Sequence, residues 1–307
     1  MKIVLLDALT FGDTNLSDFN TLGEIKVYQT SLADEVQQRV ANATVIVTNK
    51  VVITKEIMQN SLNLKLICIA ATGMNNVDLD AAKELDIKVK NVVAYSTDSV
   101  IQHTFSMLFY LLGHSRYYDE SVKSGAYSKS EIFTDVSKPF YEIKNKKWGI
   151  IGLGDIGRGV AKIATAFGAN ICYYSTSGKN HSQEYERVKL KELLMSCDII
   201  SIHAPLNVNT QNLLDYEQFS TCKDGAVILN LGRGGIINEN AVAKIIDEKN
   251  LYFGLDVLEK EPMLKNHPLL SVKNSDKLYI SPHIAWTSKE AREKLISGVI
   301  QNIKSSF

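Results

Sequence analysis

The sequence predicts an α/β protein with two doubly wound parallel sheets, and three observations support this fold class. The chain has 307 residues, about twice the length of a typical domain, so two hydrophobic cores are expected. Short apolar runs alternate with amphipathic stretches, as buried parallel strands alternate with covering helices. This alternation stops once, in a polar stretch, and starts again near Trp148.

The first series of elements fills roughly residues 1–95. Its apolar runs predict strands over 2–7, 25–28, 45–48, 66–70 and 87–91. Between them, residues 31–41 and 78–85 have helical spacing and acidic residues near their starts. These elements make one complete α/β unit.

Two different segments follow the first unit. Residues 99–112 are largely apolar with His103 among them, and residues 96–98 offer hydroxyl and carboxylate caps, so a long buried helix is predicted. Residues 115–145 are polar and rich in Tyr, Ser and Lys, which favours a connection that wraps over the surface.

The second series starts at Trp148, where a strand leads into a glycine-rich turn. Further strands are predicted over 170–174, 198–203, 226–231, 252–257 and 278–280. A last helix is predicted over 288–304, where Ala291, Leu295, Val299 and Ile303 recur at helical spacing. Periodicity does not determine which of the two units this helix covers.

Composition and charge narrow the class of partner. Hydrophobic residues make up 45% and charged residues 22%, values of an ordinary globular protein. Lys+Arg and Asp+Glu both number 34, so the formal net charge is zero and no long-range field attracts nucleic acid or anionic lipid. We therefore expect a small-molecule partner, no nucleic acid and no membrane.

The N-terminus and the cysteines indicate a reducing compartment. The N-terminal apolar run is broken by Asp7 and is too short for a signal peptide or a membrane span, so a cytoplasmic location is expected. Cys68, Cys172, Cys197 and Cys222 lie in or beside apolar stretches without a CxxC pair. They are expected to be reduced and buried rather than reactive or ligating, and no metal site is predicted.

The turn at Gly152, Gly154 and Gly157 predicts a dinucleotide site. A strand precedes this GxGxxG pattern and an amphipathic helix over 158–167 follows it. Gly152 permits a tight turn, Gly154 lets the backbone approach a pyrophosphate, and Gly157 allows close packing of helix on strand. The alternative is a purely structural glycine turn, and the strand and helix on either side favour the dinucleotide site.

The residues after the next strand leave the choice between NAD and NADP open. An NAD site usually presents Asp or Glu to the adenosine ribose at this point. Here the chain has Ser175, Thr176, Ser177, Gly178 and Lys179, without a carboxylate. Hydroxyl groups and a lysine could receive a 2′-phosphate. A polar loop that accepts either cofactor explains these residues equally well.

Three polar residues follow predicted strands and could carry the chemistry. Arg233 stands among glycines in residues 230–235, where a guanidinium could clamp a substrate carboxylate. His283 and Glu261 could form an acid/base pair, because a carboxylate stabilises the imidazolium. Their spacing in the sequence does not show whether these residues meet in the fold, and each one alone could be a surface or capping residue.

Together these segments resemble the D-isomer-specific 2-hydroxyacid dehydrogenase family over essentially the whole chain. The matching segments are the Gly152 turn and residues 71–78, 99–104, 203–206, 230–235, 255–257, 261–262 and 281–283. Residues 48–50, 95–97 with Phe105, and 283–286 resemble the glycerate dehydrogenase or hydroxypyruvate reductase branch. The segment between Arg233 and Glu261 is slightly shorter than the family's spacing, and we place the difference near Lys249.

The resemblance implies an architecture and an assembly. It implies a discontinuous, flavodoxin-like substrate domain over residues 1–97 and 283–307, a Rossmann cofactor domain over residues 98–282, and a cleft between them that binds substrate. It also implies a homodimer, with residues 115–140 as the contact region.

The resemblance further implies a catalytic set and a cofactor. Arg233 would bind the carboxylate and polarise the carbonyl, His283 would donate or accept the proton, and Glu261 would orient His283. The cofactor, NAD or NADP, would contact Thr104, Gly152, Gly154, Asp155, Ile156, Gly157, Ser175, Thr176, Ser177, Lys179, His203, Ala204, Pro205, Thr210, Leu231, Gly232, Asp256 and His283. Asp256 would bind the nicotinamide amide and Thr104 would neighbour the ring, although a strand-end cap and a helix hydroxyl are alternative roles.

The implied reaction is reversible reduction of a small 2-oxo acid, of the glyoxylate, hydroxypyruvate or pyruvate type, to a D-2-hydroxy acid. Substrate contacts are implied at Asn49, Lys50, Thr72, Gly73, Met74, Arg233 and Trp286. Lys50 could instead be an ordinary loop lysine. An alternative function on the same scaffold is a nicotinamide-sensing, corepressor-like binding protein. The chain length favours a minimal enzyme over that alternative and over longer relatives that act on phosphoglycerate or formate.

Overall fold

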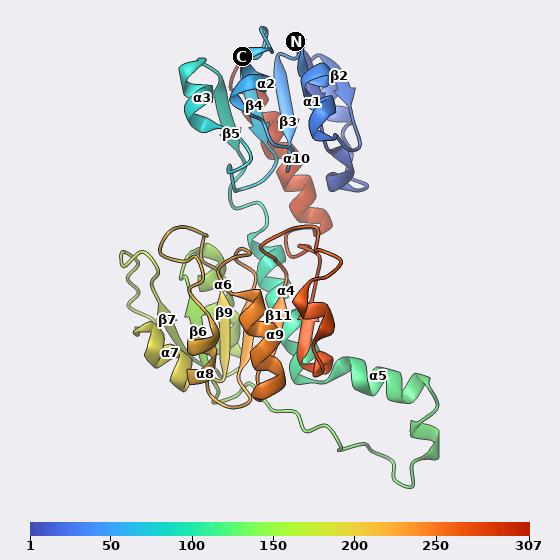
Figure 1. Cartoon of the computed structure of the whole chain (residues 1–307), viewed down its shortest axis with the longest axis vertical. Coiled ribbons are helices and arrows are strands. Elements are labelled where there is room, and N and C mark those ends of the chain that lie inside the picture. The colour runs from blue at the N-terminus through green and yellow to red at the C-terminus, as the bar shows by residue number, and fades with distance from the viewer. The chain divides into compact units, whose positions relative to one another are not determined.

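The apolar runs of the first series form a five-stranded sheet in which all neighbouring strands are parallel (Figure 1). In this computed structural model, which describes residues 1–307, the strands are β1 (Lys2–Leu5), β2 (Glu24–Val27), β3 (Val45–Thr48), β4 (Leu66–Ile69) and β5 (Lys88–Asn91). Their order is β2-β1-β3-β4-β5, which is the flavodoxin-like order. The central strands β3 and β4 are buried along their whole length, whereas Glu24 and Lys26 leave the edge strand β2 largely exposed.

The chain divides into two compact units, and the first comprises residues 1–96 and 287–307. Its helices are α1 (Ala33–Val40), α2 (Lys55–Gln59), α3 (Leu79–Glu84) and α10 (Lys289–Lys304), with short 3-10 turns η1 (Ala8–Phe11) and η2 (Ser17–Thr21).

The last helix, α10, packs on β4 and β5 of the first unit. The side-chain amide of Asn302 donates to the carbonyl of Asn91 over 2.8 Å. A Cβ on Gly298 would lie only 2.6 Å from Cγ1 of Val92, so the helix can approach the chain this closely only with glycine there. These contacts assign α10 to the first unit, which periodicity left open.

The second unit, residues 97–286, contains a seven-stranded sheet whose neighbouring strands are also all parallel. Its strands are β6 (Lys147–Ile151), β7 (Asn170–Tyr174), β8 (Glu186–Arg187), β9 (Ile199–Ile202), β10 (Val227–Asn230), β11 (Tyr252–Leu255) and β12 (Leu278–Ile280). From β6 the sheet extends to β7 and β8 on one side and to β9, β10, β11 and β12 on the other. This is the Rossmann order, and it places a topological switch point between β6 and β9. The predicted fold class is confirmed for both sheets.

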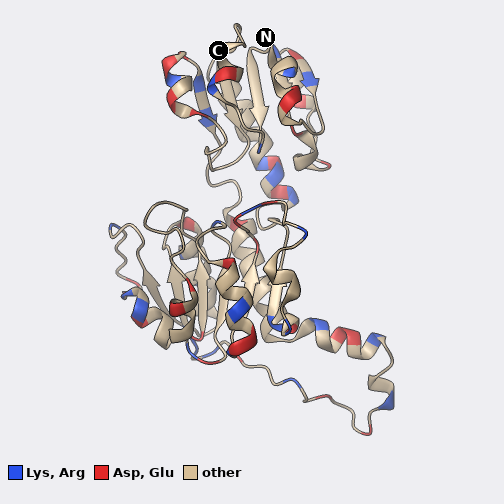
Figure 2. Cartoon of the chain, in the orientation of Figure 1, with Lys and Arg blue, Asp and Glu red and all other residues tan.

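Helices pack on this second sheet, and Lys, Arg, Asp and Glu are distributed over both helices and loops (Figure 2). The helices of this unit are α4 (Thr97–Leu112), α5 (Ser115–Lys123), α6 (Asp155–Ala166), α7 (Leu190–Ser196), α8 (Tyr216–Thr221) and α9 (Glu239–Glu248), with 3-10 turns η3 (Tyr127–Lys129), η4 (Pro268–Ser271) and η5 (Ser275–Lys277). The predicted long helix, α4, is buried against α6 and the sheet, where the ring centroid of Phe105 lies 5.3 Å from that of Trp148. No helix of the chain has both the length and the apolar character that crossing a membrane requires.

Two predicted boundaries differ from the structure. The polar stretch over 115–145 begins with the helix α5, in which Arg116 and Glu120, and Asp119 and Lys123, form ion pairs one helical turn apart. Because α5 buries no residue, apolar periodicity could not reveal it. Helix α6 starts at Asp155 rather than at Arg158, since Gly154 is its N-cap and the glycine at 157 lies inside the helix.

Candidate active site

The glycine turn after β6 is shaped by close backbone contacts. Gly152 has φ +95°, and a Cβ there would lie 2.9 Å from the backbone nitrogen of Ala204, which lies just after β9. A Cβ on Gly157 would lie 2.3 Å from the carbonyl oxygen of Gly152. Both positions therefore require glycine, and together they hold the start of α6 against the switch point of the sheet.

The middle glycine has a different role. Gly154 is the N-cap of α6, has an ordinary φ of −86°, and would have no atom within 4 Å of an added Cβ. Neither strain nor crowding requires glycine here. Its bare backbone leaves open space before the N-terminus of α6, where the free N–H groups and the helix dipole suit a diphosphate. The turn fits the diphosphate of a dinucleotide.

The loop over residues 175–181 carries positive charge and no carboxylate. The hydroxyl of Ser177 accepts from the backbone of Lys179 over 3.2 Å. Arg187 of β8 donates from Nη1 to the carbonyl of Gly178 over 3.1 Å, and Arg158 of α6 donates from Nη2 to the carbonyl of residue 181 over 3.4 Å. Neither arginine was among the predicted cofactor residues, because only the pairing of β8 with β7 and the course of α6 bring them to this loop.

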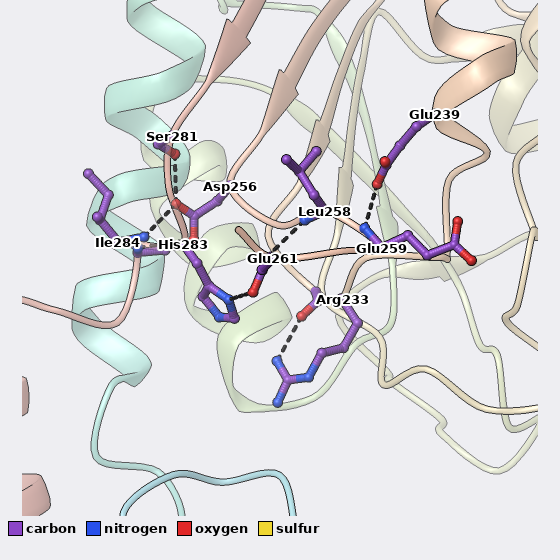
Figure 3. A network of polar contacts seen from close by, with 11 residues as sticks. Arg233, Glu239, Asp256, Leu258, Glu259, Glu261, Ser281, His283 and Ile284 are labelled. Carbon is purple, nitrogen blue, oxygen red and sulfur yellow. Dashed lines mark hydrogen bonds and ion pairs between the residues drawn. The ribbon is translucent and has the colours of Figure 1, made fainter. Parts of the chain in front are cut away.

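The loop that carries Arg233 follows β10. The side chain of Asn230 donates to the carbonyl of Arg233 over 3.0 Å and accepts from the backbone of Gly232 over 3.1 Å. The Arg233 side chain is exposed, and its Nη1 donates to the carbonyl of Gly232 over 2.8 Å (Figure 3). Asn230 thus fixes the loop backbone and leaves the rest of the guanidinium available to a ligand.

The Arg233 loop lies directly against the loop that carries Glu261. A Cβ on Gly234 would lie 1.9 Å from the carbonyl oxygen of Leu258, so no other residue permits this approach. Glu261 accepts from the backbone of Leu258 at Oε1 over 3.0 Å, and Glu259 donates its backbone N–H to Glu239 at the start of α9 over 2.6 Å (Figure 3). Two loops far apart in sequence are joined in this way.

His283 completes the group. Its Nδ1 lies 2.7 Å from Oε2 of Glu261, and the two side chains keep 22% and 30% of their surface exposed, so a ligand can reach them (Figure 3). With Nδ1 held by a carboxylate, Nε2 is the nitrogen that can exchange a proton with a bound substrate. The structure therefore brings the predicted His283 and Glu261 together, with Arg233 on the adjoining loop.

Asp256, at the end of β11, binds the turn that carries His283. Its Oδ1 accepts from the hydroxyl of Ser281 over 2.6 Å and from the backbone of Ile284 over 2.9 Å, and its Oδ2 accepts from the backbone of Ala285 over 3.0 Å. Of the two roles considered for Asp256, these contacts are those of a strand-end cap. Ser281 was not among the predicted site residues.

Three other predicted cofactor residues turn their polar atoms away from solvent. Thr104 is fully buried and donates to the carbonyl of Val100 within α4, and Thr210 is fully buried and donates to the carbonyl of Pro205. The ring nitrogens of His203 are buried without a hydrogen-bond partner in the chain, and burial lowers the pKa of His203 to about 3. Their contact with a cofactor stays a prediction.

The predicted substrate residues of the first unit lie at the carboxyl ends of β3 and β4. The buried carboxylate of Asp7 accepts from the backbone N–H groups of Asn49 at 2.9 Å and Lys50 at 2.7 Å, which fixes this loop. The Asn49 side chain donates to the carbonyl of Ala70, just before Thr72. Asp7 was not among the predicted site residues, because in the sequence it stands out only as a break in an apolar run.

The fold and the glycine turn together define a dinucleotide-binding protein of the Rossmann class. A family model described as "D-isomer specific 2-hydroxyacid dehydrogenase, NAD binding domain" matches residues 105–285. The chain is 36% identical to hydroxypyruvate reductase of Blautia hydrogenotrophica, over 99% of this chain and 96% of that protein. It is 31% identical to glycerate dehydrogenase of Methylorubrum extorquens, over 99% and 95%.

A solved structure of an acyclic imino acid reductase in complex with NADPH and D-Arg matches with a TM-score of 0.85 and 30% identity, over 99% of this chain and 95% of that one. The chain therefore belongs to the D-isomer specific 2-hydroxyacid dehydrogenase family, as the sequence motifs predicted. It is an enzyme of the oxidoreductase class, acting on CH–OH donors.

Proposed function

We propose that this enzyme reversibly reduces a small 2-oxo acid, of the glyoxylate, hydroxypyruvate or pyruvate type, to the D-2-hydroxy acid. The observation that carries the proposal is the 2.7 Å contact between His283 Nδ1 and Glu261 Oε2, on a loop joined to that of Arg233. The names of the relatives, hydroxypyruvate reductase and glycerate dehydrogenase, support the same substrate class.

Each residue has a distinct task in this mechanism. Arg233 pairs with the substrate carboxylate and stabilises the charge that develops on the carbonyl oxygen. His283 donates the proton from Nε2 to that oxygen, and Glu261 orients the ring and stabilises its charged form. The nicotinamide, when bound, supplies the hydride to the C2 carbon. In the reverse direction His283 accepts the hydroxyl proton.

We also propose roles for the two units. The second unit holds the dinucleotide at its glycine turn, and the loops around Asn49, Lys50 and residues 72–74 of the first unit, with Trp286, contact the substrate. The bonds from the backbone of residues 49–50 to the Asp7 carboxylate support this role, because a fixed loop keeps the side chains that it carries in position for a ligand.

We propose NADP(H) as the preferred cofactor. The loop over 175–181 has no carboxylate to repel a 2′-phosphate, and Arg158, Lys179 and Arg187 supply positive charge around it. Arginine binds phosphate through paired N–H groups. The related imino acid reductase was solved with NADPH, which supports the same choice.

A homodimer in the cytoplasm completes the proposal. The exposed hydrophobic side chains between α5 and β6 include Ile132 (59%), Phe133 (90%), Val136 (76%) and Phe140 (66%), and a second copy of the chain would bury them. All four cysteines are free and buried, which fits a reducing compartment. Light scattering of the wild type and Phe133→Ser, which should dissociate the dimer, tests the assembly, and cell fractionation tests the location.

The experiment that tests the activity is an oxidation screen of NADH and NADPH against glyoxylate, hydroxypyruvate, pyruvate and larger 2-oxo acids. We expect turnover with at least one small acid, a D product on chiral analysis, and higher kcat/KM with NADPH. Tight dinucleotide binding without turnover of any 2-oxo acid would overturn the proposal in favour of the corepressor-like alternative. His283→Gln is the matched control, because it should bind dinucleotide but lose turnover.

A further inference from the structure

A histidine in the apolar helix α4 contacts the turn that carries His283. Nε2 of His103 lies 3.0 Å from Oγ of Ser281 and 3.5 Å from Oδ1 of Asp256. The side chain of His103 keeps 15% of its surface exposed and that of Asp256 only 1%. Burial lowers the pKa of His103, and the nearby Asp256 carboxylate raises it in part, so a polar ring at this position needs a structural or functional reason.

The hydroxyl of Ser281 fixes the direction of these hydrogen bonds. Ser281 has one proton, and its 2.6 Å contact with Oδ1 of Asp256 directs that proton to the carboxylate. The Ser281 oxygen therefore accepts from Nε2–H of His103. This arrangement is not a hydrolytic triad, since Ser281 is buried and gives its proton to the acid instead of to the histidine.

The chain of contacts continues from Asp256 to His283. The carboxylate of Asp256 accepts from Ile284 and Ala285, on the far side of His283, and its backbone carbonyl accepts from the N–H of His283 over 2.8 Å. The backbone of His283 has φ +55°, in the left-handed region. Residues other than glycine adopt this conformation rarely, and they need surroundings that hold them in it. Asp256 imposes this conformation, because it holds the turn on both sides of His283. It binds the side chain of Ser281 before His283, the N–H of His283 itself, and the N–H groups of the two residues that follow.

We propose that His103 is a positioning residue for His283, acting through Ser281 and Asp256 to hold the left-handed turn that aims the catalytic imidazole. The proposal rests on the proposed role of His283 as proton donor. Without the His103 donor, Ser281 can rotate away from Asp256, and the turn loses one of the bonds that impose its conformation. His283 then spends less time within 2.7 Å of Glu261.

Three variants test the proposal. His103→Leu removes the donor to Ser281, His103→Gln keeps an N–H donor at similar reach, and Ser281→Ala removes the link between the two groups. Since small misplacements of catalytic groups are costly, we expect His103→Leu and Ser281→Ala each to lower kcat by about tenfold to a hundredfold. KM for the oxo acid should change less than about twofold, and His103→Gln should recover most of the activity. The double variant should cost no more than either single variant, because both break one chain of contacts.

A second readout does not depend on turnover. With the ring nitrogens of the six histidines labelled with ¹⁵N, the wild type at alkaline pH should show His283 protonated on Nδ1, where Glu261 accepts. His103→Leu should shift His283 towards a mixture of its two tautomers, and His103→Gln should not. The groups that face position 103 are Asp256 and the ring of Tyr279, whose centroid lies 6.4 Å from that of His103. Neither group is changed in these two variants.

The outcomes separate the two proposals. An unchanged His283 spectrum and wild-type kcat in His103→Leu would overturn the positioning role. If no 2-oxo acid is turned over at all, the proposed function fails while the spectrum still tests the contact chain. If His103→Leu does not fold, Ser281→Ala and His103→Gln give the same comparison. The proposal is then overturned if both variants lose the same amount of stability while kcat and the His283 tautomer stay unchanged.

Discussion

Nδ1 of His283 lies 2.7 Å from Oε2 of Glu261, and the same carboxylate accepts at Oε1 from the backbone of Leu258 over 3.0 Å. One carboxylate therefore orients the imidazole and ties its own loop in place. Because a Cβ on Gly234 would collide with the carbonyl oxygen of Leu258, that loop also fixes the distance to the Arg233 loop. The loop of Glu261 thus contacts both the proton-transfer histidine and the loop that carries Arg233.

Glu261→Gln keeps a hydrogen-bonding side chain but removes the negative charge beside His283. The imidazole loses the carboxylate that orients it and balances its charge, so we expect kcat for reduction to fall by about tenfold to a hundredfold. Steady-state kinetics at one fixed pH check this, with Glu259→Gln on the same loop as control. Kinetic constants that match the wild type would remove Glu261 from the proton-transfer pair.

Arg233→Lys keeps a positive charge but loses the planar pair of N–H donors. We expect KM for the oxo acid to rise and kcat to fall, with a combined loss of about a hundredfold or more in kcat/KM. Dinucleotide affinity, measured by protein-to-nicotinamide fluorescence transfer, should stay within about twofold. Wild-type kinetics in this variant would contradict the assigned role.

Gly152→Ala and Gly154→Ala should behave differently although both alter the same turn. At Gly152 the left-handed φ and the backbone of Ala204 leave no room for a methyl group, so the alanine variant should be destabilised by about 3 kcal/mol. At Gly154 the added methyl meets no atom of the chain, so stability should be unchanged while the Kd for NADPH rises by about tenfold or more. Thermal unfolding and titration with NADPH check the pair. Equal stability of both variants would contradict the geometry of the turn.

Arg187→Ala tests the choice of cofactor. Loss of this guanidinium should weaken binding of NADPH and of 2′,5′-ADP by about tenfold, and leave binding of NADH and 5′-AMP within about twofold. Calorimetry with the two adenosine phosphates measures this without any turnover. Lys191→Ala, on the neighbouring helix α7, is the control. Parallel losses for phosphorylated and unphosphorylated ligands would show that Arg187 supports the loop rather than the 2′-phosphate.

His203 should make the second unit less stable in acid. Burial lowers the pKa of His203 from 6.5 to about 3 in the folded chain. Between these two pH values only the unfolded chain takes up the proton, so the free energy of unfolding is largest above pH 6.5 and decreases as the pH falls from 6.5 towards 3. Between pH 7 and pH 5 the loss amounts to about 2 kcal/mol.

His203→Leu removes the titrating group, so its unfolding free energy should depend less on pH by this amount. Both tryptophans, Trp148 and Trp286, lie in the second unit, so their fluorescence in urea reports its unfolding. An identical pH dependence in wild type and variant would show that the ring gains a proton or a partner in the folded state.

Much of the fold followed from local patterns. Fully buried strands such as β3 and β4 read as continuous apolar runs, and the turn at Gly152 has its strand and helix beside it in sequence. The helix α5 could not be predicted from such patterns, because it buries no residue and its ion pairs lie on an exposed surface. Arg233, Glu261 and His283 were found as separate candidates and through their motifs, but no spacing rule joins residues so far apart.

The two parallel sheets, the dinucleotide turn and the three candidate residues could be predicted from the sequence, because periodicity and glycine patterns act over a few residues. The contact of Glu261 with His283, the binding of the His283 turn by Asp256, and the approach of His103, Arg158 and Arg187 to these sites follow only from the folded chain. Parallel strands bring their carboxyl ends to one edge of a sheet whatever their separation in the chain. The contacts made there depend on strand order, which no local pattern encodes.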